Sequence, residues 1–384
     1  MKVGIFVGDL DPLKGGESSL TKTILLEIKK HSDPDLDYVF LYYNKSRGSE
    51  YTFMNEYKFI NISKCCSIGR LVLNGLVESL GGASGRFFAL DKLASKEGID
   101  AFYFAAPIYA QTSLPYIFTV WDLGHRTTPY FPEMSSDDWG YREKMYSHML
   151  PRATYIITAN ECGKKDILKY YNVDEERIMA VPFPVTSLCR SMEKKPDFYR
   201  DSDCFFYPAQ FWPHKNHIVI LEALKILKEE SELKPVVYFT GSDKGNKKYL
   251  EEMISRYGLD DLVVFTGFIE DGEVKYLYKH SKALVFASLL GPNNLPPIEA
   301  KYLGCPIILS DIPGHREQMG DDATYFDGYD ARDLAEKMKQ AMSVQNIERD
   351  ENPSEDDSVY FEKVRGLLIN IRDLISRWKY VKEQ

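Results

Sequence analysis

The feature that most constrains this chain is a regular alternation of short apolar runs with stretches of helical spacing. The runs are rich in Val, Ile, Phe and Tyr, and most are continuous rather than interrupted by polar residues. Continuous apolar runs are typical of strands covered on both faces, as in a parallel sheet. Between the runs, Leu20, Ile24 and Ile28 repeat every four residues, as do Leu250 and Ile254, which is the spacing of one helix face. The pattern predicts an α/β protein built from right-handed βαβ units in doubly wound sheets.

The candidate strands fall into two groups along the chain. The first group comprises residues 2–7, 38–43, 58–62, 101–105, 116–121 and 154–158. The second group comprises residues 178–181, 204–208, 236–240, 262–266, 283–287 and 306–309. The alternation restarts near residue 203, after a polar segment from Ser191 to Asp197 that we interpret as an interdomain linker. Two Rossmann-like domains are therefore expected.

The end of the chain has a different character. An acidic stretch from Asn346 to Ser358 precedes a periodic apolar stripe from Val364 to Val381. A single amphipathic helix needs a folded surface to cover its apolar face. We therefore expect a first domain over residues 1–190, a second over 191–355, and a C-terminal helix over 356–384 that is laid across them.

Composition excludes several functional classes. The net charge of −9 disfavours non-specific nucleic-acid binding. The sequence has no apolar run long enough to span a membrane, and its first apolar stretch is too short for a signal peptide. The six cysteines form no CxxC pair and are interpreted as reduced thiols. A cytoplasmic protein is expected. Residues 69–93 could form an interfacial helix at a membrane, although a core-facing helix is the plainer interpretation.

Ligands of doubly wound sheets bind beyond the carboxyl ends of the strands, so the residues that follow each strand are the candidates. After the first strand, Gly15 and Gly16 allow backbone N–H groups to approach an anion at a helix N-terminus, or they form only a tight turn. After the strand 116–121, Asp122 and His125 form a polar cluster. His125 is either a solvated loop residue or one that orients a hydroxyl group.

Three loops of the second group carry polar residues. Gln210, His214 and Lys215 follow the strand 204–208, where a lysine beside a helix N-terminus suits a diphosphate. The loops that contain Gly241 and the pair Phe268 and Ile269 follow the next two strands. The second of these loops is either the wall of a nucleobase site or an ordinary strand exit. These residues predict a nucleotide site in the second domain.

The strongest element runs from Ser288 to Ala300. A rigid Pro/Gly/Asn loop leads into a helix that carries Glu299 in its first turn. Glu299 either compensates the helix dipole or bridges the hydroxyls of a ribose. The residues of this element that we expect in a ligand site are Gly291, Asn293, Asn294, Leu295 and Glu299.

The chain lacks the glycine fingerprint of dinucleotide-binding proteins and the Walker loop, so a nicotinamide-dependent oxidoreductase is disfavoured. No pattern has the spacing of metal ligands. The Asp9-Leu10-Asp11 segment has the DxD form of a metal-binding motif, but we do not interpret it as a metal site. Neither a metal nor an organic cofactor is expected.

These segments together resemble the retaining family 4 glycosyltransferases with the GT-B fold, in which two Rossmann-like domains face each other across the active site. The resemblance covers most of the chain. It is carried by Gly15-Gly16, Thr119 to Leu123, Ala153 to Glu161, Pro182 to Val185, Lys215, Thr266 to Ile269, Leu295 to Ala300, and Gly304 to Ile308.

The resemblance implies a role for each candidate. Lys215 would hold the donor diphosphate and Glu299 the ribose, with Phe268 and Ile269 at the base. Asp122 and His125 would lie near the reacting sugar and the acceptor. The Gly15-Gly16 loop would close over the phosphates, and the C-terminal helix would cross back to the first domain.

Three positions depart from the family pattern. The family usually has two glutamates separated by seven residues, and here the first of these positions is Gly291. The first glutamate usually contacts the donor sugar, and Asn293 or Asn294 would replace that contact. Gln210 stands where an arginine often precedes the lysine, and Trp121 stands where a histidine often precedes the aspartate. Trp121 is able to stack on a sugar face instead.

The expected activity is transfer of a hexose from a nucleoside-diphosphate sugar to a glycan or lipid-linked saccharide, with retention and without a metal. A GDP-sugar such as GDP-mannose is slightly favoured, and the setting is polysaccharide synthesis of O-antigen type at the inner face of the plasma membrane. The alternative is a nucleotide-sugar-binding or scaffold protein that has lost catalysis, which Gly291 motivates.

Overall fold

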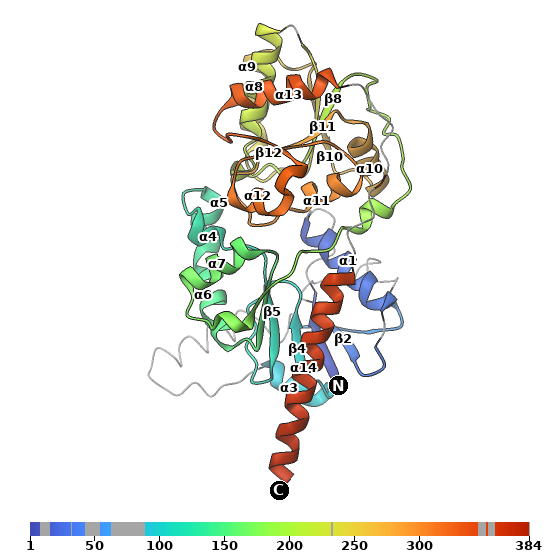
Figure 1. Ribbon diagram of the computed structural model, residues 1–384, viewed down its shortest axis with the longest axis vertical. Helices are drawn as coiled ribbons and strands as arrows, with labels where there is room; N and C mark the ends of the chain where they lie inside the picture. Colours follow the sequence, from blue (N-terminus) through green and yellow to red (C-terminus); the bar gives the residue numbers. More distant parts are fainter. Residues whose placement is uncertain are drawn as a thin grey trace.

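The computed structural model describes residues 1–7, 16–31, 33–42, 54–62, 89–231, 233–344, 351 and 358–383. Its described residues form two domains, each built around a parallel sheet, with a long C-terminal helix alongside the first (Figure 1). The doubly wound α/β class predicted from the alternation is confirmed.

The first sheet has the strand order β3-β2-β1-β4-β5-β6-β7, and every pair of neighbours is parallel. Its strands are β1 (Lys2–Phe6), β2 (Asp37–Tyr42), β3 (Lys58–Asn61), β4 (Ala101–Phe104), β5 (Tyr116–Val120), β6 (Tyr155–Thr158) and β7 (Ile178–Ala180). The run at 178–181, which the sequence grouped with the second set, is therefore the edge strand of the first sheet. The segment Ser191 to Asp197 lies between the two sheets along the chain.

The second sheet has the strand order β10-β9-β8-β11-β12-β13 and is also parallel. Its strands are β8 (Cys204–Pro208), β9 (Val236–Thr240), β10 (Val263–Gly267), β11 (Ala283–Phe286), β12 (Ile307–Ser310) and β13 (Thr324–Phe326). The sequence did not predict β13, a short edge strand in which only Phe326 is buried. So short a strand carries too little apolar pattern to be found from sequence.

Helices connect the strands in both domains. Those of the first domain are α1 (Gly16–Lys30), α3 (Ala89–Glu97), α4 (Gly124–Thr127), α5 (Pro132–Ser135), α6 (Asp137–Met149) and α7 (Glu161–Tyr170), with short 3-10 turns at Leu150–Arg152, Glu175–Arg177 and Ser187–Arg190. Those of the second are α8 (His217–Glu230), α9 (Lys247–Tyr257), α10 (Asp271–His280), α11 (Leu295–Tyr302), α12 (Pro313–Met319) and α13 (Ala331–Ser343), with 3-10 turns at Pro213–Lys215 and Gly320–Asp322. No helix among the described residues is both long and apolar enough to cross a membrane.

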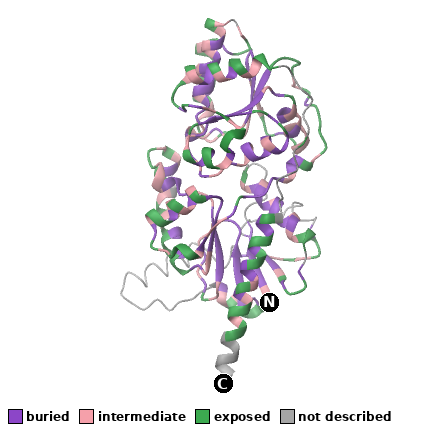
Figure 2. Ribbon diagram, viewed as in Figure 1, coloured by how far each residue is buried: buried purple, intermediate pink, exposed green. Residues whose placement is uncertain are grey.

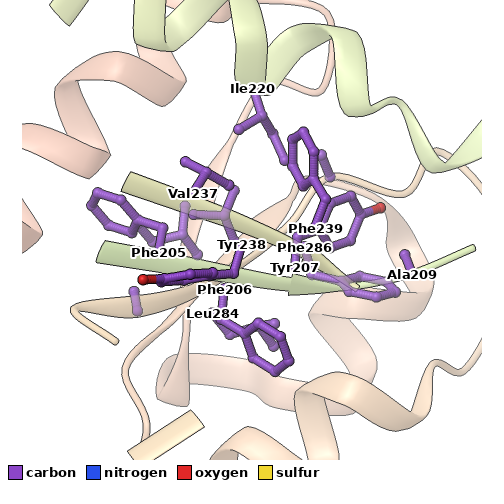
Figure 3. Packing of buried hydrophobic residues seen from close by; sticks show 14 of the residues in the cluster. Phe205, Phe206, Tyr207, Ala209, Ile220, Val237, Tyr238, Phe239, Leu284 and Phe286 are labelled. Carbon is purple, nitrogen blue, oxygen red and sulfur yellow. The ribbon is translucent and has the colours of Figure 1, made fainter. Parts of the chain in front are cut away.

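Both domains bury their strands between layers of helices, and the burial is concentrated in the sheets (Figure 2). In the second domain, aromatic rings from neighbouring strands fill the space on each face of the sheet (Figure 3). Tyr207 packs edge-on against Phe286 with ring centroids 5.3 Å apart, a favoured aromatic geometry. This packing holds the carboxyl ends of β8 and β11 close together, where the candidate loops begin.

The final helix, α14 (Ser358–Glu383), packs on the first domain (Figure 1). Tyr360, Val364, Leu368 and Ile371 are buried in the first-domain core. The hydroxyl groups of Tyr360 and Tyr103 lie 2.6 Å apart inside that core. The first domain therefore covers the part of the apolar stripe from Val364 to Ile371, whereas Leu374 is exposed.

Candidate active site

A cavity of about 750 Å³ lies between the two domains. Loops that follow strands of both sheets line it, as expected for doubly wound folds. The predicted residues that line it are Gly16, Asp122, Gln210, His214, Lys215, Gly241, Phe268, Ile269, Gly291, Asn293, Asn294, Leu295 and Glu299. Gly15, the Asp9 to Asp11 segment and most of the 69–93 segment lie outside the described residues.

Lys215 provides a cation at the wall of this cavity. It ends a 3-10 turn between β8 and α8, and the Tyr207 hydroxyl donates a hydrogen bond to its carbonyl oxygen at 2.6 Å. Its Nζ donates to Ser288 Oγ at 3.3 Å and to Asn294 Oδ1 at 3.2 Å. Burial lowers the pKa of Lys215 to about 8. The group is charged at neutral pH and held by neutral acceptors, so its charge is available to an anion.

His214, the residue before Lys215, contacts the other domain. Its backbone N–H donates to Glu133 Oε1 at 2.9 Å, and its Nδ1 lies 2.5 Å from the same oxygen. Glu133 belongs to α5 of the first domain, and both side chains are nearly buried. Burial lowers the pKa of His214, although the Glu133 carboxylate opposes this. A first-domain carboxylate thus fixes the loop that carries Lys215.

Glu299 lies in α11 and is only 5% exposed. Thr186 donates its hydroxyl to Oε1 at 2.6 Å, and Tyr278 donates to Oε2 at 2.7 Å. Burial raises the pKa of this carboxyl group. Each oxygen keeps acceptor capacity beyond its protein donor, so the carboxylate is able to receive hydrogen bonds from sugar hydroxyls.

Asp122 faces the cavity from the end of β5. Its Oδ1 accepts hydrogen bonds from Arg142 and, at 2.7 Å, from the Gly124 N–H. Burial alone would raise the pKa of Asp122, but the Arg142 guanidinium and these hydrogen bonds lower it overall. The residue is an ionised carboxylate whose charge is largely matched by Arg142.

The structure corrects the prediction for His125. It does not line the cavity; it is fully buried, with its ring 5.5 Å from that of Tyr146. Its Nε2 lies 3.2 Å from the Tyr171 hydroxyl and 3.3 Å from Glu143 Oε2. Burial lowers its pKa to about 4. His125 is a core residue here, because the short helix α4 turns its side chain under α6 rather than toward the ligand space.

Gly291 has a backbone conformation that favours glycine. Its φ is +125°, and a Cβ built there would lie 2.7 Å from Asn294 Nδ2. A side chain at this position would collide with the asparagine that holds Lys215. Glycine at this position is therefore compatible with the observed place of Asn294, whereas a larger residue would force Asn294 to move.

Two side chains at the cavity have hydrogen-bonding groups without a protein partner among the described residues. Asn293 Nδ2 and Trp121 Nε1 are both buried and unpaired, and they approach from different domains. A buried N–H donor without a partner is costly. Because both residues line the cavity, a small rotation of either side chain would bring its N–H group to an oxygen acceptor of a ligand.

Sequence reasoning missed two functional candidates. Glu133 holds His214 but lies on a different domain, so its spacing in the sequence gives no signal. Lys247 begins α9 and lines the cavity, with its Nζ 5.2 Å from the centroid of the Phe265 ring. The acidic side chain of Asp243 caps this turn by accepting the Lys247 N–H at 3.2 Å. The Gly241 to Gly245 loop was noticed, and following it one turn further would have reached Lys247.

Comparisons with known proteins agree with this geometry. Residues 190–356 match the family model for glycosyl transferases group 1. The O-antigen chain mannosyltransferase RfbU of Salmonella typhimurium is 28% identical over 225 residues, which is 57% of this chain and 58% of that protein. O-antigen chain mannosyltransferase B of Escherichia coli is 23% identical over 234 residues, 59% of this chain and 61% of that protein. The chain thus matches about three fifths of the length of these relatives.

Solved structures extend the likeness to the whole chain. A glycosyltransferase from Rickettsia africae has a TM-score of 0.63 at 15% identity and covers 99% of this chain and 98% of its own. HepE from Anabaena, in complex with UDP and glucose, has a TM-score of 0.64 at 12% identity and covers 99% of each chain. With the two doubly wound domains, these neighbours confirm the GT-B fold.

Proposed function

We propose that this protein is a retaining glycosyltransferase that moves a hexose from a nucleoside-diphosphate sugar to a glycan or lipid-linked saccharide. GDP-mannose is the first donor to consider, because the relatives of the matched region include O-antigen chain mannosyltransferases. The proposed setting is the synthesis of a surface polysaccharide of O-antigen type, at the cytoplasmic face of the membrane that holds the acceptor.

The observation that carries the proposal is Lys215 at the interdomain cavity. Glycosyl transfer breaks the bond between the anomeric carbon and an oxygen of the β-phosphate, so negative charge grows on the diphosphate. The Lys215 ammonium group would stabilise that charge in a partly buried site, where electrostatic interactions are strong. Removing one such donor typically costs about 10²–10³-fold in kcat.

The remaining lining residues fit the rest of a donor. Glu299 would accept hydrogen bonds from the ribose, and Phe268, which is 58% exposed at the cavity, would cover the base. Of the two asparagines, Asn293 has the free N–H donor, whereas both ends of the Asn294 amide are occupied. We therefore assign the contact with the donor sugar to Asn293.

The first domain would supply the acceptor side. Asp122, held by Arg142, and Trp121 both line the cavity from the first domain. Closure of the domains around both substrates would exclude water and so limit hydrolysis of the donor. The proposal includes neither a metal nor an organic cofactor.

The first experiment is a thermal-shift panel of GDP, UDP, ADP and their hexose forms, with and without EDTA, followed by a transfer assay with lipid-linked saccharides. A ligand at about 100 times its Kd adds ~2.7 kcal/mol to the free energy of unfolding, which is a visible shift. We expect one nucleotide to stand out in the presence of EDTA. Lys215→Ala should abolish transfer, whereas Lys195→Ala, which removes an exposed lysine paired with Asp201, should not.

The other outcomes decide between functions. Binding of a sugar nucleotide without turnover, over a range of acceptors, would favour the scaffold alternative and point to Gly291. A folded protein that binds no nucleotide would overturn the donor site.

A further inference from the structure

Asn293 and Asn294 lie in the loop between β11 and α11, called here the donor loop. Their side-chain amides are oriented in opposite ways. Asn294 turns its carbonyl oxygen toward Lys215 Nζ, at 3.2 Å. Asn293 lines the cavity, accepts a hydrogen bond from Gln318 at its carbonyl oxygen, and has a buried NH₂ group without a partner among the described residues. An amide side chain that is free to rotate has no fixed polarity, so the surroundings of each asparagine must set its orientation. Those surroundings are provided by one short helix, α12.

His315 of α12 sets the orientation of Asn294. Its ring is fully buried, and its Nδ1 lies 2.8 Å from the Ser310 carbonyl oxygen. A carbonyl oxygen only accepts, so Nδ1 carries the proton and Nε2 is an acceptor. Nε2 lies 3.0 Å from Asn294 Nδ2. The Asn294 NH₂ group must therefore face His315, which leaves its oxygen for Lys215.

Gln318, on the same helix, sets the orientation of Asn293. Its Nε2 donates to Asn293 Oδ1 at 2.6 Å and to the Asn294 carbonyl oxygen at 2.7 Å. Its Oε1 accepts the Asn294 backbone N–H at 3.3 Å. Three hydrogen bonds thus fix the amide of Gln318 itself, and the Asn293 oxygen is bound to it. The Asn293 N–H groups are left without a protein acceptor among the described residues.

The helix is held firmly against the loop. A Cβ at Gly314 would lie 2.6 Å from the carbonyl oxygens of Gly291 and Pro292, so α12 approaches the loop closely. On the side of the first domain, the Glu317 carboxylate accepts the backbone N–H groups of Glu161 and Cys162 at 2.6 and 2.7 Å. These contacts fix α12 between the donor loop and the first domain.

We propose that His315 and Gln318 are positioning residues that set the polarity of the donor loop. Through them, Asn294 offers an acceptor to Lys215, and Asn293 offers a donor to an oxygen of the transferred sugar. Without the His315 acceptor, only the long bond to the Leu290 carbonyl oxygen and the attraction of Lys215 would hold the Asn294 amide in this orientation. The identity of the ligand rests on the proposed function. The tautomer of His315 is independent of that function.

The tautomer is tested first, on the full chain without ligand. Long-range proton–nitrogen NMR of the histidine rings, with His315→Gln to assign the signal, should show a neutral His315 protonated on Nδ1 at neutral pH. The same form should persist under mildly acidic conditions, because burial lowers its pKa to about 4. A ring protonated on Nε2, or on both nitrogens at neutral pH, would overturn the proposal.

Two matched substitutions test the consequence. His315→Gln places an oxygen acceptor near the former Nε2. His315→Asn ends near the former Nδ1, keeps the Ser310 bond and leaves the Asn294 NH₂ group with only the long hydrogen bond to the Leu290 carbonyl oxygen, at 3.5 Å. We expect His315→Asn to weaken GDP binding on the order of tenfold, as for a lost hydrogen bond to a charged group. GMP binding should hardly change, because Lys215 would contact the outer phosphate, and His315→Gln should restore GDP binding. UDP and UMP serve as the parallel pair.

Equal losses in both variants, or equal losses for GDP and GMP, would show a merely structural role and overturn the proposal. If the wild-type chain binds no nucleotide, the proposed function fails while the NMR result still decides the positioning role.

Gln318→Glu supplies a variant at a half-buried position that does not depend on replacing the buried histidine. A carboxylate there still accepts the Asn294 N–H but no longer donates to Asn293 Oδ1 or to the Asn294 carbonyl oxygen. GDP affinity should stay within a few-fold while kcat for transfer falls on the order of tenfold, and Asn293→Asp should behave alike. A Gln318→Glu enzyme with unchanged kcat would contradict the role of Gln318.

Discussion

Lys215 has two properties that a residue needs in order to stabilise a phosphate leaving group. Ser288 and Asn294 hold it without neutralising it, and burial lowers its pKa to about 8. A positive charge at that place is therefore present at pH 7 and is lost as the pH rises through about 8. The phosphates of a donor would meet a charged group only below that point.

The pH dependence of kcat/KM for the donor follows from this pKa. Because kcat/KM reports the ionisation of the free enzyme, it should decline above pH about 8 as Lys215 loses its proton. Steady-state rates between pH 6 and 10 would show the decline.

Lys215→Arg is the matched variant, because a guanidinium group stays protonated throughout this range. Its activity should be lower, since one flexible point charge is replaced by a planar fork, but the alkaline decline should vanish. A decline of the same midpoint in the arginine variant would mean that another group titrates.

At the residue scale, prediction from sequence worked for side chains whose place is set by their own loop. Lys215 and Glu299 follow strands of one parallel sheet, so both were expected at the same edge, and both line the cavity. His125 also follows a strand, yet it is buried under α6. The direction in which a short helix turns a side chain depends on the layer packed over it, which local sequence does not encode.

The loop between β11 and α11 is the element that most distinguishes this chain. Its conformation depends on Gly291 at φ +125° and on direct contact of α12 with the carbonyl groups that follow. From the sequence alone, Gly291 is interpreted as the loss of a glutamate contact with the donor sugar, which Asn293 or Asn294 would replace. The structure shows instead a loop whose path has no room for a side chain at this position.

Replacing Gly291 by glutamate should therefore lower both the stability and the activity of the protein. Gly291→Glu places a Cβ in a left-handed conformation and against Asn294, which should cost about 1–2 kcal/mol in backbone strain and more through the clash. We expect a lower Tm and a loss of transfer. Thermal unfolding and kcat/KM measure the two effects separately.

Gly98→Ala is the control for backbone strain alone. Gly98 has φ +69°, a Cβ added to it would meet no atom within 4 Å, and it has no part in the cavity. The substitution should lower Tm modestly and leave kcat/KM unchanged. A Gly291→Glu enzyme that is more active than wild type would contradict this account of the loop.

Across the whole molecule, polar contacts join the two domains at two loops of the second domain. One is the turn that carries His214 and Lys215, and the other is the loop between β11 and α11. Glu133 holds His214 beside Lys215, and Asn160 donates from the first domain to the carbonyl oxygen of Pro292. Thr186 reaches Glu299 from the segment before the second sheet. First-domain side chains thus contact both loops and help to shape the cavity between the domains.

Removing one of these contacts should favour an open form. Glu133→Ala deletes the acceptor of two hydrogen bonds from His214, worth about 1–3 kcal/mol in all. Small-angle scattering should then show a larger radius of gyration, and donor hydrolysis should rise relative to transfer.

Glu133→Gln is the matched control, because its carbonyl oxygen still accepts both hydrogen bonds. It should resemble the wild type in scattering and in the ratio of hydrolysis to transfer. If Glu133→Ala leaves both measurements unchanged, the contact does not contribute to closure.

The sequence by itself determined the two parallel sheets and the edge at which the candidate residues gather, because strand patterning and strand-end loops are local properties of a βαβ chain. Only the tertiary structure decided which groups surround those residues. His315, Gln318 and Glu133 act on loops that are 21 to 81 residues away in the chain. The distances, the tautomer and the orientation of each amide arise where elements pack together, and packing partners are not written in the spacing of residues along one segment.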